Sequence, residues 1–156
     1  MSFDGWGVGG NRAPFMEVLG ARGVRHAEGC VSFEMVVEDR HLRTLGIAHG
    51  GVTAALLDSA LGFAAGTTAP QGHHVVTVQL NINYIRPAWK GEKLIATAEV
   101  RHAGQKTAVS RGEIRTSENI LVASATGTFM YLPTPAGKDH VMPRHDETER
   151  CPTEPS

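Results

Sequence analysis

The sequence predicts an α+β domain, in which one long buried helix packs against a mostly antiparallel sheet of five to six strands. Residues 50–65 supply the helix, because between positions 51 and 65 the only polar side chains are Thr53, Asp58 and Ser59. A helix that is apolar on all sides is normally buried. The strands come from the rest of the chain, where polar and apolar residues alternate with a period of two.

The composition describes a single globular domain. The chain has 156 residues, of which 41% are hydrophobic and 20% charged, enough to bury one core. A net charge of −1 gives no reason to expect nucleic acid or a membrane surface as a partner. No segment has the pattern of a membrane span or a secretory signal.

The two cysteines, Cys30 and Cys151, do not form a disulfide framework by their spacing. Cys30 lies in a strand-like segment and Cys151 in a polar tail, so we expect free thiols in a reducing compartment. The expected location is therefore the cytoplasm.

The first half of the chain contains a flexible arm, a short helix and a hairpin. Glycines dominate the arm, residues 1–13. Pro14 suits the first position of a helix and Gly20 suits the position after its end, which predicts a helix over residues 14–19. Strands over residues 24–27 and 30–37 are separated by a Glu-Gly turn.

Four strands are predicted after the long helix, over residues 75–85, 93–102, 106–115 and 120–132. The first of these shows the clearest alternation, and Gly127 suggests a β-bulge in the last. From residue 133 onward the chain holds five of its eight prolines, so residues 133–156 are expected to be a disordered or surface-draped tail. The folded domain is thus predicted to span residues 14–132.

The buried helix also predicts self-association. One sheet of this size cannot enclose a helix on every side, so a second copy of the chain is expected to cover the remaining face. We therefore expect a homodimer, with a homotetramer made of two dimers left open.

One motif resembles a known family. The pattern Gly46-x-x-His49-Gly50-Gly51, with Asp58 nine positions after the histidine, resembles the hotdog-fold acyl-CoA thioesterases of the phenylacetic-acid-degradation type. The likeness extends over about residues 16–132. It implies the hotdog fold and an acyl-CoA thioesterase that hydrolyses a thioester to a free acid and coenzyme A, without a metal or redox cofactor.

Gly50 and Gly51 stand where the long helix begins. The first backbone N–H groups of a helix have no internal partner, and a residue without a side chain lets a ligand oxygen approach them. Such a site suits the oxyanion of a thioester under attack, although glycines also allow tight packing of the helix start. The resemblance favours the oxyanion site, with the Gly50 N–H as donor and Gly51 in substrate binding.

Asp58 has three possible roles: a base that activates water, a nucleophile that forms a mixed anhydride, or a structural group bonded to the backbone or to Ser59. The resemblance favours catalysis and assigns Ser59 to substrate binding. His49 either holds the loop before the helix or orients the site. Thr77 stands where many relatives carry a Ser or Thr that positions water.

Arg43 is a departure from the family pattern. Relatives usually have Asn or Gln six residues before the histidine, where it binds the substrate or the water. An arginine has no acceptor atom and keeps its charge. It could donate to the thioester oxygen, pair with Asp58 or point to solvent.

Helix geometry separates His49 from Asp58. Nine residues place the two on opposite faces and roughly 13 Å apart along the axis. One helix cannot easily bring both of its groups to one thioester, whereas two helices related by a two-fold axis can. We therefore predict that Gly50 of one subunit and Asp58 of the other share each site.

The sequence also bears on two other functions. A hotdog-type enoyl-CoA hydratase would need an Asp where this chain has Thr44, which argues against it. A non-catalytic acyl-CoA or acyl-lipid binding protein stays open because of Arg43. Candidate cations for the phosphates of coenzyme A lie on the later strands and turns: Arg86, Lys90, Lys93, Lys106, Arg111 and Arg115.

Overall fold

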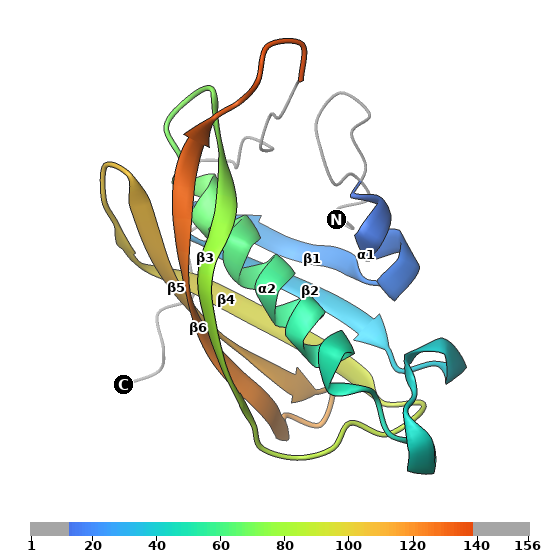
Figure 1. The fold of residues 1–156 in the computed structure, drawn as a ribbon. Coiled ribbons are helices and arrows are strands. Elements are labelled where there is room, and N and C mark those ends of the chain that lie inside the picture. The colour runs from blue at the N-terminus through green and yellow to red at the C-terminus, as the bar shows by residue number, and fades with distance from the viewer. Residues whose placement is uncertain (1–12, 139–156) are drawn as a thin grey trace.

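The structure, a computed structural model, describes residues 13–138. It contains two helices, six strands and two short 3-10 turns (Figure 1). The helices are α1 (Pro14–Leu19) and α2 (Gly50–Thr67), and the 3-10 turns cover Asp39–His41 and Thr44–Gly46. The strands are β1 (Arg22–Ala27), β2 (Cys30–Val36), β3 (His73–Tyr84), β4 (Lys93–Ala103), β5 (Thr107–Thr116) and β6 (Leu121–Pro133).

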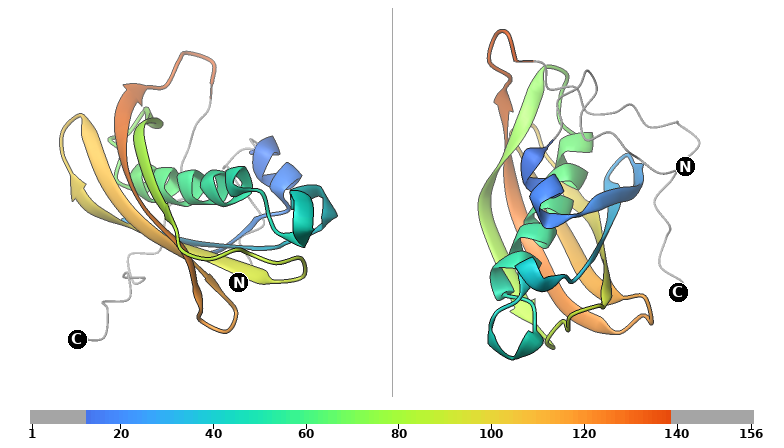
Figure 2. Two further views of the ribbon diagram at one scale, coloured as in Figure 1. Left: turned by 60° about the horizontal axis from the view of Figure 1, so that its bottom comes forward. Right: turned by 90° about the vertical axis from the view of Figure 1, so that its right-hand side faces the viewer.

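All six strands belong to one antiparallel sheet, in the order β1-β2-β4-β5-β6-β3. The sheet curves around α2, and α1 lies beside the helix near β1 (Figures 1 and 2). The predicted α+β architecture, with a long central helix wrapped by a curved antiparallel sheet, is confirmed.

One face of α2 forms the core with the sheet. Leu56, Leu57 and Leu61 are fully buried, together with Phe33 of β2 and Ile114 of β5. Burial of each such side chain stabilises the fold by about 1.5–3 kcal/mol.

The opposite face of α2 is only half-buried. It carries Ala54, Ala55, Asp58, Ser59 and Gly62. The single chain therefore buries α2 on one side only, and the other side is partly open to a partner or a ligand.

A β-bulge interrupts β3. Thr77 pairs with Phe129 and Gln79 with Thr128, so Val78 is an extra residue on β3. The extra residue reverses the facing of the side chains on its two sides. The expected single alternation over residues 75–85 is therefore wrong: Val75 packs against the core, whereas Val76 and Val78 are 38% and 55% exposed.

Gly127 does not form the bulge that the sequence suggested. It pairs regularly with Ser110 of β5 and with Leu80 of β3. Its Cβ position would lie 2.8 Å from Cε2 of Phe129, two residues along the same strand. A larger residue at position 127 would clash with the Phe129 ring, which folds back over Gly127.

Cys30, on β2, is disulfide-bonded in the structure, so the expectation of a free thiol at this position is wrong. Pairing depends on which cysteine the fold brings within about 6 Å, and sequence spacing does not reveal that. Cys151 lies outside the described residues, as do residues 1–12 and 139–156 of the predicted arm and tail. Within the described range, neither helix is long and apolar enough to cross a membrane.

Candidate active site

His49 caps the N-terminus of α2. Its backbone is extended (φ −62°, ψ 138°), and its Nδ1 accepts a hydrogen bond of 2.8 Å from the Gly51 N–H. A Cβ at position 51 would lie 2.9 Å from that nitrogen, closer than real contacts allow. Gly51 is therefore needed for the cap to form, which supports the interpretation of His49 as a group that holds the helix start.

The cap determines which N–H group of the helix start is left for a ligand. The Gly51 N–H donates to the His49 ring, and the Val52 N–H donates to the His49 carbonyl at 2.9 Å. Gly50 is the first residue of the helix, so its N–H has no acceptor inside the helix. Of these three groups, the Gly50 N–H is the one available to an oxyanion.

Tyr84, at the end of β3, contacts the same helix start and was missed by the sequence analysis. Its hydroxyl donates to the Gly50 carbonyl at 3.1 Å, and its Cε1 lies 3.4 Å from where a Gly50 Cβ would stand. The sequence places Tyr84 at a strand end but gives no signal that the strand end reaches the helix.

Asp58 and Thr77 are brought together. The Thr77 hydroxyl donates to Oδ1 of Asp58 at 2.8 Å. Within residues 13–138, no other hydrogen bond or ion pair involves the Asp58 side chain. Thr77 therefore fixes the carboxylate and leaves Oδ2 open to a water molecule or a carbonyl carbon. Ser59 lies beside Asp58 but is not its partner.

A cavity of about 410 Å³ opens beside this pair. Asp58, Ser59 and Thr77 supply polar groups, and Met16, Phe63, Val75 and Phe129 supply apolar ones. The cavity lies between α1, α2 and the β3–β6 side of the sheet. Its volume suits a small ligand or one end of a larger one.

The structure thus divides the predicted site residues into two groups. His49, Gly50 and Gly51 stand at the start of α2, whereas Asp58, Ser59 and Thr77 stand at the cavity. Gly50 and Asp58 are eight residues apart on one helix, or about 12 Å along its axis.

Arg43 belongs to neither group in the single chain. Its side chain is exposed, and no described residue forms a hydrogen bond or ion pair with it. Its backbone N–H donates to the Ile47 carbonyl at 2.9 Å, within a tight loop where Leu45 has a φ of +71°. Of the three expectations for Arg43, pairing with Asp58 of its own chain is not seen.

The sequence model of the thioesterase superfamily matches residues 45–123. The chain belongs to the thioesterase superfamily. The predicted family and the predicted class, a thioester hydrolase, are thereby confirmed.

Proteins similar to this chain include enzymes and proteins of known structure. A medium/long-chain acyl-CoA thioesterase of Escherichia coli is 35% identical over 97 residues, which cover 54% of this chain and 62% of that protein. Human acyl-coenzyme A thioesterase 13 is 40% identical over 85 residues, 54% of this chain and 60% of that protein. The PaaI protein of the E. coli phenylacetic acid degradation operon superposes with a TM-score of 0.74 at 29% identity, covering 79% of this chain and 87% of PaaI.

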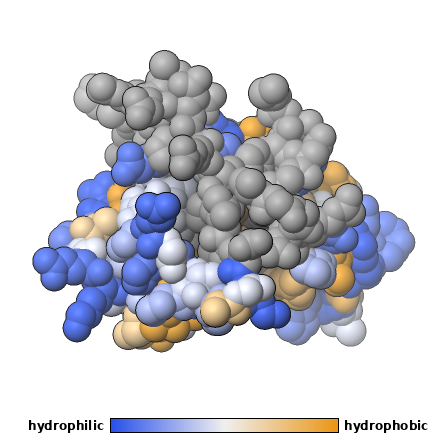
Figure 3. Space-filling view, turned by 90° about the horizontal axis from the view of Figure 1, so that it is seen from above, coloured by the Kyte–Doolittle hydropathy of each residue, from blue (hydrophilic) through white to orange (hydrophobic). Residues whose placement is uncertain are grey.

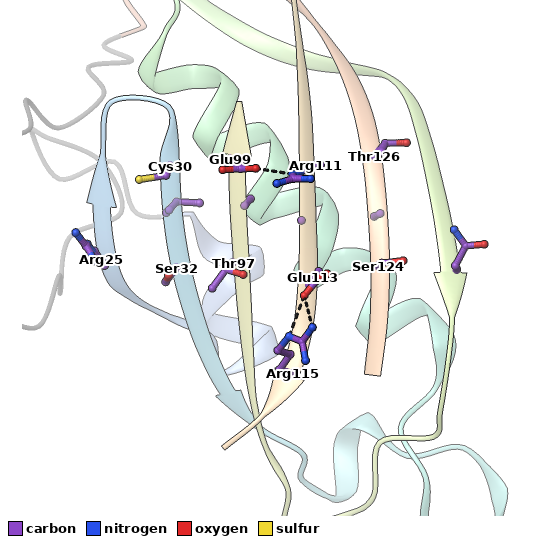
Figure 4. Close-up of a pocket in the computed structure, with 15 residues that line it drawn as sticks. Arg25, Cys30, Ser32, Thr97, Glu99, Arg111, Glu113, Arg115, Ser124 and Thr126 are labelled. Carbon is purple, nitrogen blue, oxygen red and sulfur yellow. Dashed lines mark hydrogen bonds and ion pairs between the residues drawn. The ribbon is translucent and has the colours of Figure 1, made fainter. Parts of the chain in front are cut away.

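A second cavity, of about 510 Å³, lies on the face of the thioesterase sheet that is turned away from α2 (Figure 4). Ser32, Thr97 and Ser124 line it, together with the ion pairs Arg111–Glu99 and Arg115–Glu113. The sheet separates this cavity from Asp58.

Most of the cations considered for coenzyme A are already paired with carboxylates: Arg86 with Glu92, Lys90 with Asp39, Lys93 with Glu34, Arg111 with Glu99, and Arg115 with Glu113. Lys106 is exposed, and within residues 13–138 it makes no ion pair. Viewed from above, the coloured surface is mostly hydrophilic (Figure 3). The described residues contain no cluster of His, Cys, Asp and Glu that could hold a metal ion.

Proposed function

We propose that this protein is an acyl-CoA thioesterase that hydrolyses a thioester to a free acid and coenzyme A. The observation that carries the proposal is the Asp58–Thr77 pair at the mouth of a largely apolar cavity. Asp58 lies on α2, and the His49 cap does not use the first N–H group of that helix. The names of the acyl-CoA thioesterases that match this chain support the choice of substrate.

In the proposed reaction, the Gly50 N–H donates to the thioester oxygen. Asp58 takes a proton from water through its open oxygen, and the resulting hydroxide attacks the carbonyl carbon. The negative charge that develops on the carbonyl oxygen is stabilised by the N–H group and the positive end of the helix dipole. Collapse of the tetrahedral intermediate breaks the C–S bond and releases the acid, and the thiolate of coenzyme A takes up the proton.

Asp58 could instead attack the carbonyl carbon itself and form a mixed anhydride, which water then hydrolyses. A single turnover in ¹⁸O-labelled water separates the two routes. In the nucleophilic route, water attacks the Asp58 carboxyl carbon of the anhydride, so a single turnover labels Asp58 and transfers an unlabelled Asp58 oxygen to the acid, whereas the base route labels the acid and leaves Asp58 unlabelled. Mass spectrometry of the peptide that contains Asp58 reads the difference.

We propose that each site combines two subunits. β3 is the last strand of the sheet order, so one of its edges is unpaired within the described chain, and it exposes Val76 and Val78. An uncovered apolar edge favours pairing with another strand. Antiparallel pairing of two β3 strands would bring the half-buried faces of two α2 helices together, with Gly50 of one chain toward Asp58 of the other.

Arg43 and His49 complete the proposed site. The Arg43 side chain has no partner among residues 13–138, so it can donate to the thioester oxygen or to coenzyme A. His49 accepts through Nδ1, which leaves Nε2 as the ring nitrogen that can donate to another group. Gly51 and Ser59 would contact the substrate at the two ends of the site.

The second candidate function is a non-catalytic acyl-CoA binding protein. Arg43 favours it, because an arginine cannot accept the hydrogen bond that the usual Asn or Gln can accept from water. In an Arg43→Asn variant, a rise in thioesterase activity would show that the arginine restrains catalysis.

The deciding experiment measures thiol release from a panel of aryl, short-chain and long-chain acyl-CoAs. Wild-type protein should release thiol from at least one of them, and Asp58→Asn should lower kcat by about 10²–10⁴-fold. Binding without any hydrolysis across the panel would favour the second candidate. Undiminished hydrolysis by Asp58→Asn would contradict the role of this residue.

A further inference from the structure

Two loops beside the start of α2 form a small antiparallel ladder. The loop before α2 and the loop after β3 lie side by side (Figures 1 and 2). Two bridges define the ladder: Leu42 with Ala48, and Ile47 with Trp89. Backbone hydrogen bonds of 2.8–3.1 Å join the same segments: the Arg43 N–H to the Ile47 carbonyl, the Ala48 N–H to the Ala88 carbonyl, and the Lys90 N–H to the Gly46 carbonyl.

The register of the ladder sorts its side chains onto two faces. Arg43, Ile47 and Trp89 lie opposite one another across the three segments, so their side chains share one face. The residues of the other face pack against the core: Leu42, Ala48 and Ala88. Trp89 is 49% exposed, and Arg43 is exposed as well. Arg43, Ile47 and Trp89 thus form an outer row that faces away from the core.

The outer row carries an exposed indole and an unpaired guanidinium. Within residues 13–138 the Arg43 side chain has no partner. Two cations of the loop after β3 already have carboxylate partners: Arg86 with Glu92, and Lys90 with Asp39. At the spacing of neighbouring strands, Arg43 and Trp89 stand about 10 Å apart across Ile47. This pairing suits a nucleotide, because a purine stacks on an indole and a guanidinium binds phosphate through parallel N–H donors.

Trp89 stands on a turn that hydrogen bonds hold in place. Its N–H donates to Oε2 of Glu92 at 2.8 Å, and the Glu92 N–H donates to the Trp89 carbonyl at 3.1 Å. Arg86 donates to the other oxygen of the same carboxylate at 2.6 Å, and the Gly91 N–H donates to the Val37 carbonyl at 2.8 Å. The backbone that carries the indole is therefore ordered before a ligand binds, which reduces the entropy lost on binding.

The outer row lies within reach of a thioester at the start of α2. Ile47 precedes Gly50 by three residues, so the two are at most about 11 Å apart. In coenzyme A about thirteen bonds separate the sulfur from the nearest phosphate, which at roughly 1.3 Å per bond extend to about 16 Å. The arm is long enough for the phosphates to meet Arg43 while the thioester carbonyl lies at the Gly50 N–H.

Resting on the proposed function, we propose that the outer row binds the nucleotide of coenzyme A. The adenine stacks on the exposed face of Trp89, the ribose lies against Ile47, and the phosphates accept hydrogen bonds from Arg43. This arrangement gives Arg43 a role in binding and keeps it away from the reacting carbonyl. A thioester that lacks the nucleotide would make none of these contacts.

Trp89 fluorescence tests the stacking directly. The chain has two tryptophans, Trp6 and Trp89, so a Trp6→Phe protein reports Trp89 alone. Coenzyme A and adenosine 3′,5′-bisphosphate should quench the emission and saturate, whereas pantetheine should not. In the same background, Arg43→Gln should raise the Kd of coenzyme A about tenfold, as expected for a lost hydrogen bond to a charged group, and Arg43→Lys should lose less.

Kinetics with a truncated substrate provide the second readout. Trp89→Ala should raise KM for an acyl-CoA about tenfold through lost stacking, with kcat unchanged. The kcat/KM for the same acyl group on N-acetylcysteamine, which has no nucleotide, should not change. Trp89→Phe retains an aromatic face and should recover most of the affinity for the acyl-CoA.

Other outcomes overturn the proposal. Equal losses of Trp89→Ala on both substrates would show that the indole only supports the loop. Tighter binding of ADP than of coenzyme A would identify a free nucleotide as the ligand. A smaller assembly of Trp89→Ala in light scattering, without a change in KM, would show that the outer row is an interface between copies of the chain.

The fluorescence titration separates this proposal from the proposed function, because it requires no hydrolysis. If no acyl-CoA is hydrolysed but coenzyme A and the bisphosphate still quench Trp89, the thioesterase proposal fails and the nucleotide site stands. If acyl-CoA is hydrolysed while neither ligand quenches Trp89, the nucleotide site alone is refuted.

Discussion

His49 has a structural role that the structure shows directly. It caps α2 through Nδ1, and this contact explains why a glycine follows two positions later. The His-Gly-Gly motif therefore meets a structural requirement first: the cap uses the N–H groups of Gly51 and Val52 and leaves the Gly50 N–H, our proposed oxyanion donor, without an acceptor in the helix.

Replacing His49 tests the cap. His49→Ala should reduce the free energy of unfolding by about 1 kcal/mol, the usual value of an N-cap, whereas His49→Asn should retain most of it because Asn is a good cap. Urea denaturation of the two variants measures this. Equal losses would show that the imidazole contributes by something other than capping.

Thr77 should orient Asp58 through its hydroxyl. We expect Thr77→Ala to lower kcat about tenfold with little change in KM, since the lost hydrogen bond has a net value of about 1.5 kcal/mol when the acceptor is charged. Thr77→Ser keeps the hydroxyl and should restore most of the rate. Steady-state kinetics on the preferred acyl-CoA measure both; failure of serine to rescue would assign Thr77 a packing role.

His41 should make folding sensitive to pH. It is 3% exposed, and its Nδ1 accepts from the Glu38 N–H at 2.9 Å. Burial, together with the nearby charge of Arg40, holds the pKa of His41 below its ordinary value of 6.5. The unfolded chain therefore binds a proton more readily, so stability is complete above about pH 6.5 and falls as the pH drops through the folded pKa.

Denaturation at several pH values measures this dependence. His41→Asn should flatten the decline that begins below about pH 6.5, because asparagine does not titrate. At lower pH a second loss is expected in both proteins, since the Lys93 ammonium, against some opposition from burial, holds the pKa of Glu34 below 4.5. An unchanged slope in His41→Asn would assign the first loss to another group.

At the scale of elements, the sequence predicts the order and approximate limits of both helices and all six strands. Helix α1, for example, begins at Pro14 and ends before Gly20, as Pro and Gly preferences indicate. Strand β3 shows where such prediction stops. Its residues alternate without a break in the sequence, but Val78 is an extra residue because β6 pairs on either side of it. Pairing between distant strands decides this, and a local pattern contains no information about it.

Strand β5 offers a matched pair of changes that test its packing. A Cβ at Gly112 would lie 2.7 Å from the Thr97 carbonyl oxygen of β4, so Gly112→Ala should destabilise the protein by about 1–3 kcal/mol. Two residues away, Ser110 is fully buried, and its hydroxyl has no hydrogen-bond partner in residues 13–138. Ser110→Ala should therefore be neutral or stabilising.

Thermal unfolding separates the two predictions. The Tm should fall by several degrees in Gly112→Ala and stay level or rise in Ser110→Ala. A loss of stability in Ser110→Ala would indicate that its hydroxyl is satisfied in solution, for example by a bound water.

At the scale of the whole molecule, our proposal is that one chain contains only half of each active site. The sequence indicates both halves, Gly50 and Asp58, and helix geometry already places them too far apart for one thioester. The exposed edge of β3 and the half-buried face of α2 support a shared site. The cavity lining could not be predicted, because Met16, Phe63 and Phe129 come from three elements whose approach depends on the sheet's curvature.

A mixture of two inactive variants tests the shared site. Gly50→Pro removes the proposed N–H donor, and proline is tolerated at the first position of a helix, while Asp58→Asn removes the carboxylate. Each variant alone should be nearly inactive. Coexpressed chains that form mixed dimers would contain one site with both defects and one with neither, so activity should return to roughly a quarter of wild type after random pairing. No recovery in isolated mixed dimers would place both groups in one chain's site.

The bulge at Val78 shifts the alternation of side chains along β3, so that the residues before and after it follow different alternations. Thr77 and Tyr84 are seven residues apart, so on a regular strand they would point to opposite faces. Both contact α2, Thr77 at Asp58 and Tyr84 at Gly50, because one extra residue stands between them. In a shared site these contacts belong to two different active centres, so deleting Val78 would turn one of the two residues away and disturb both centres of the dimer at once.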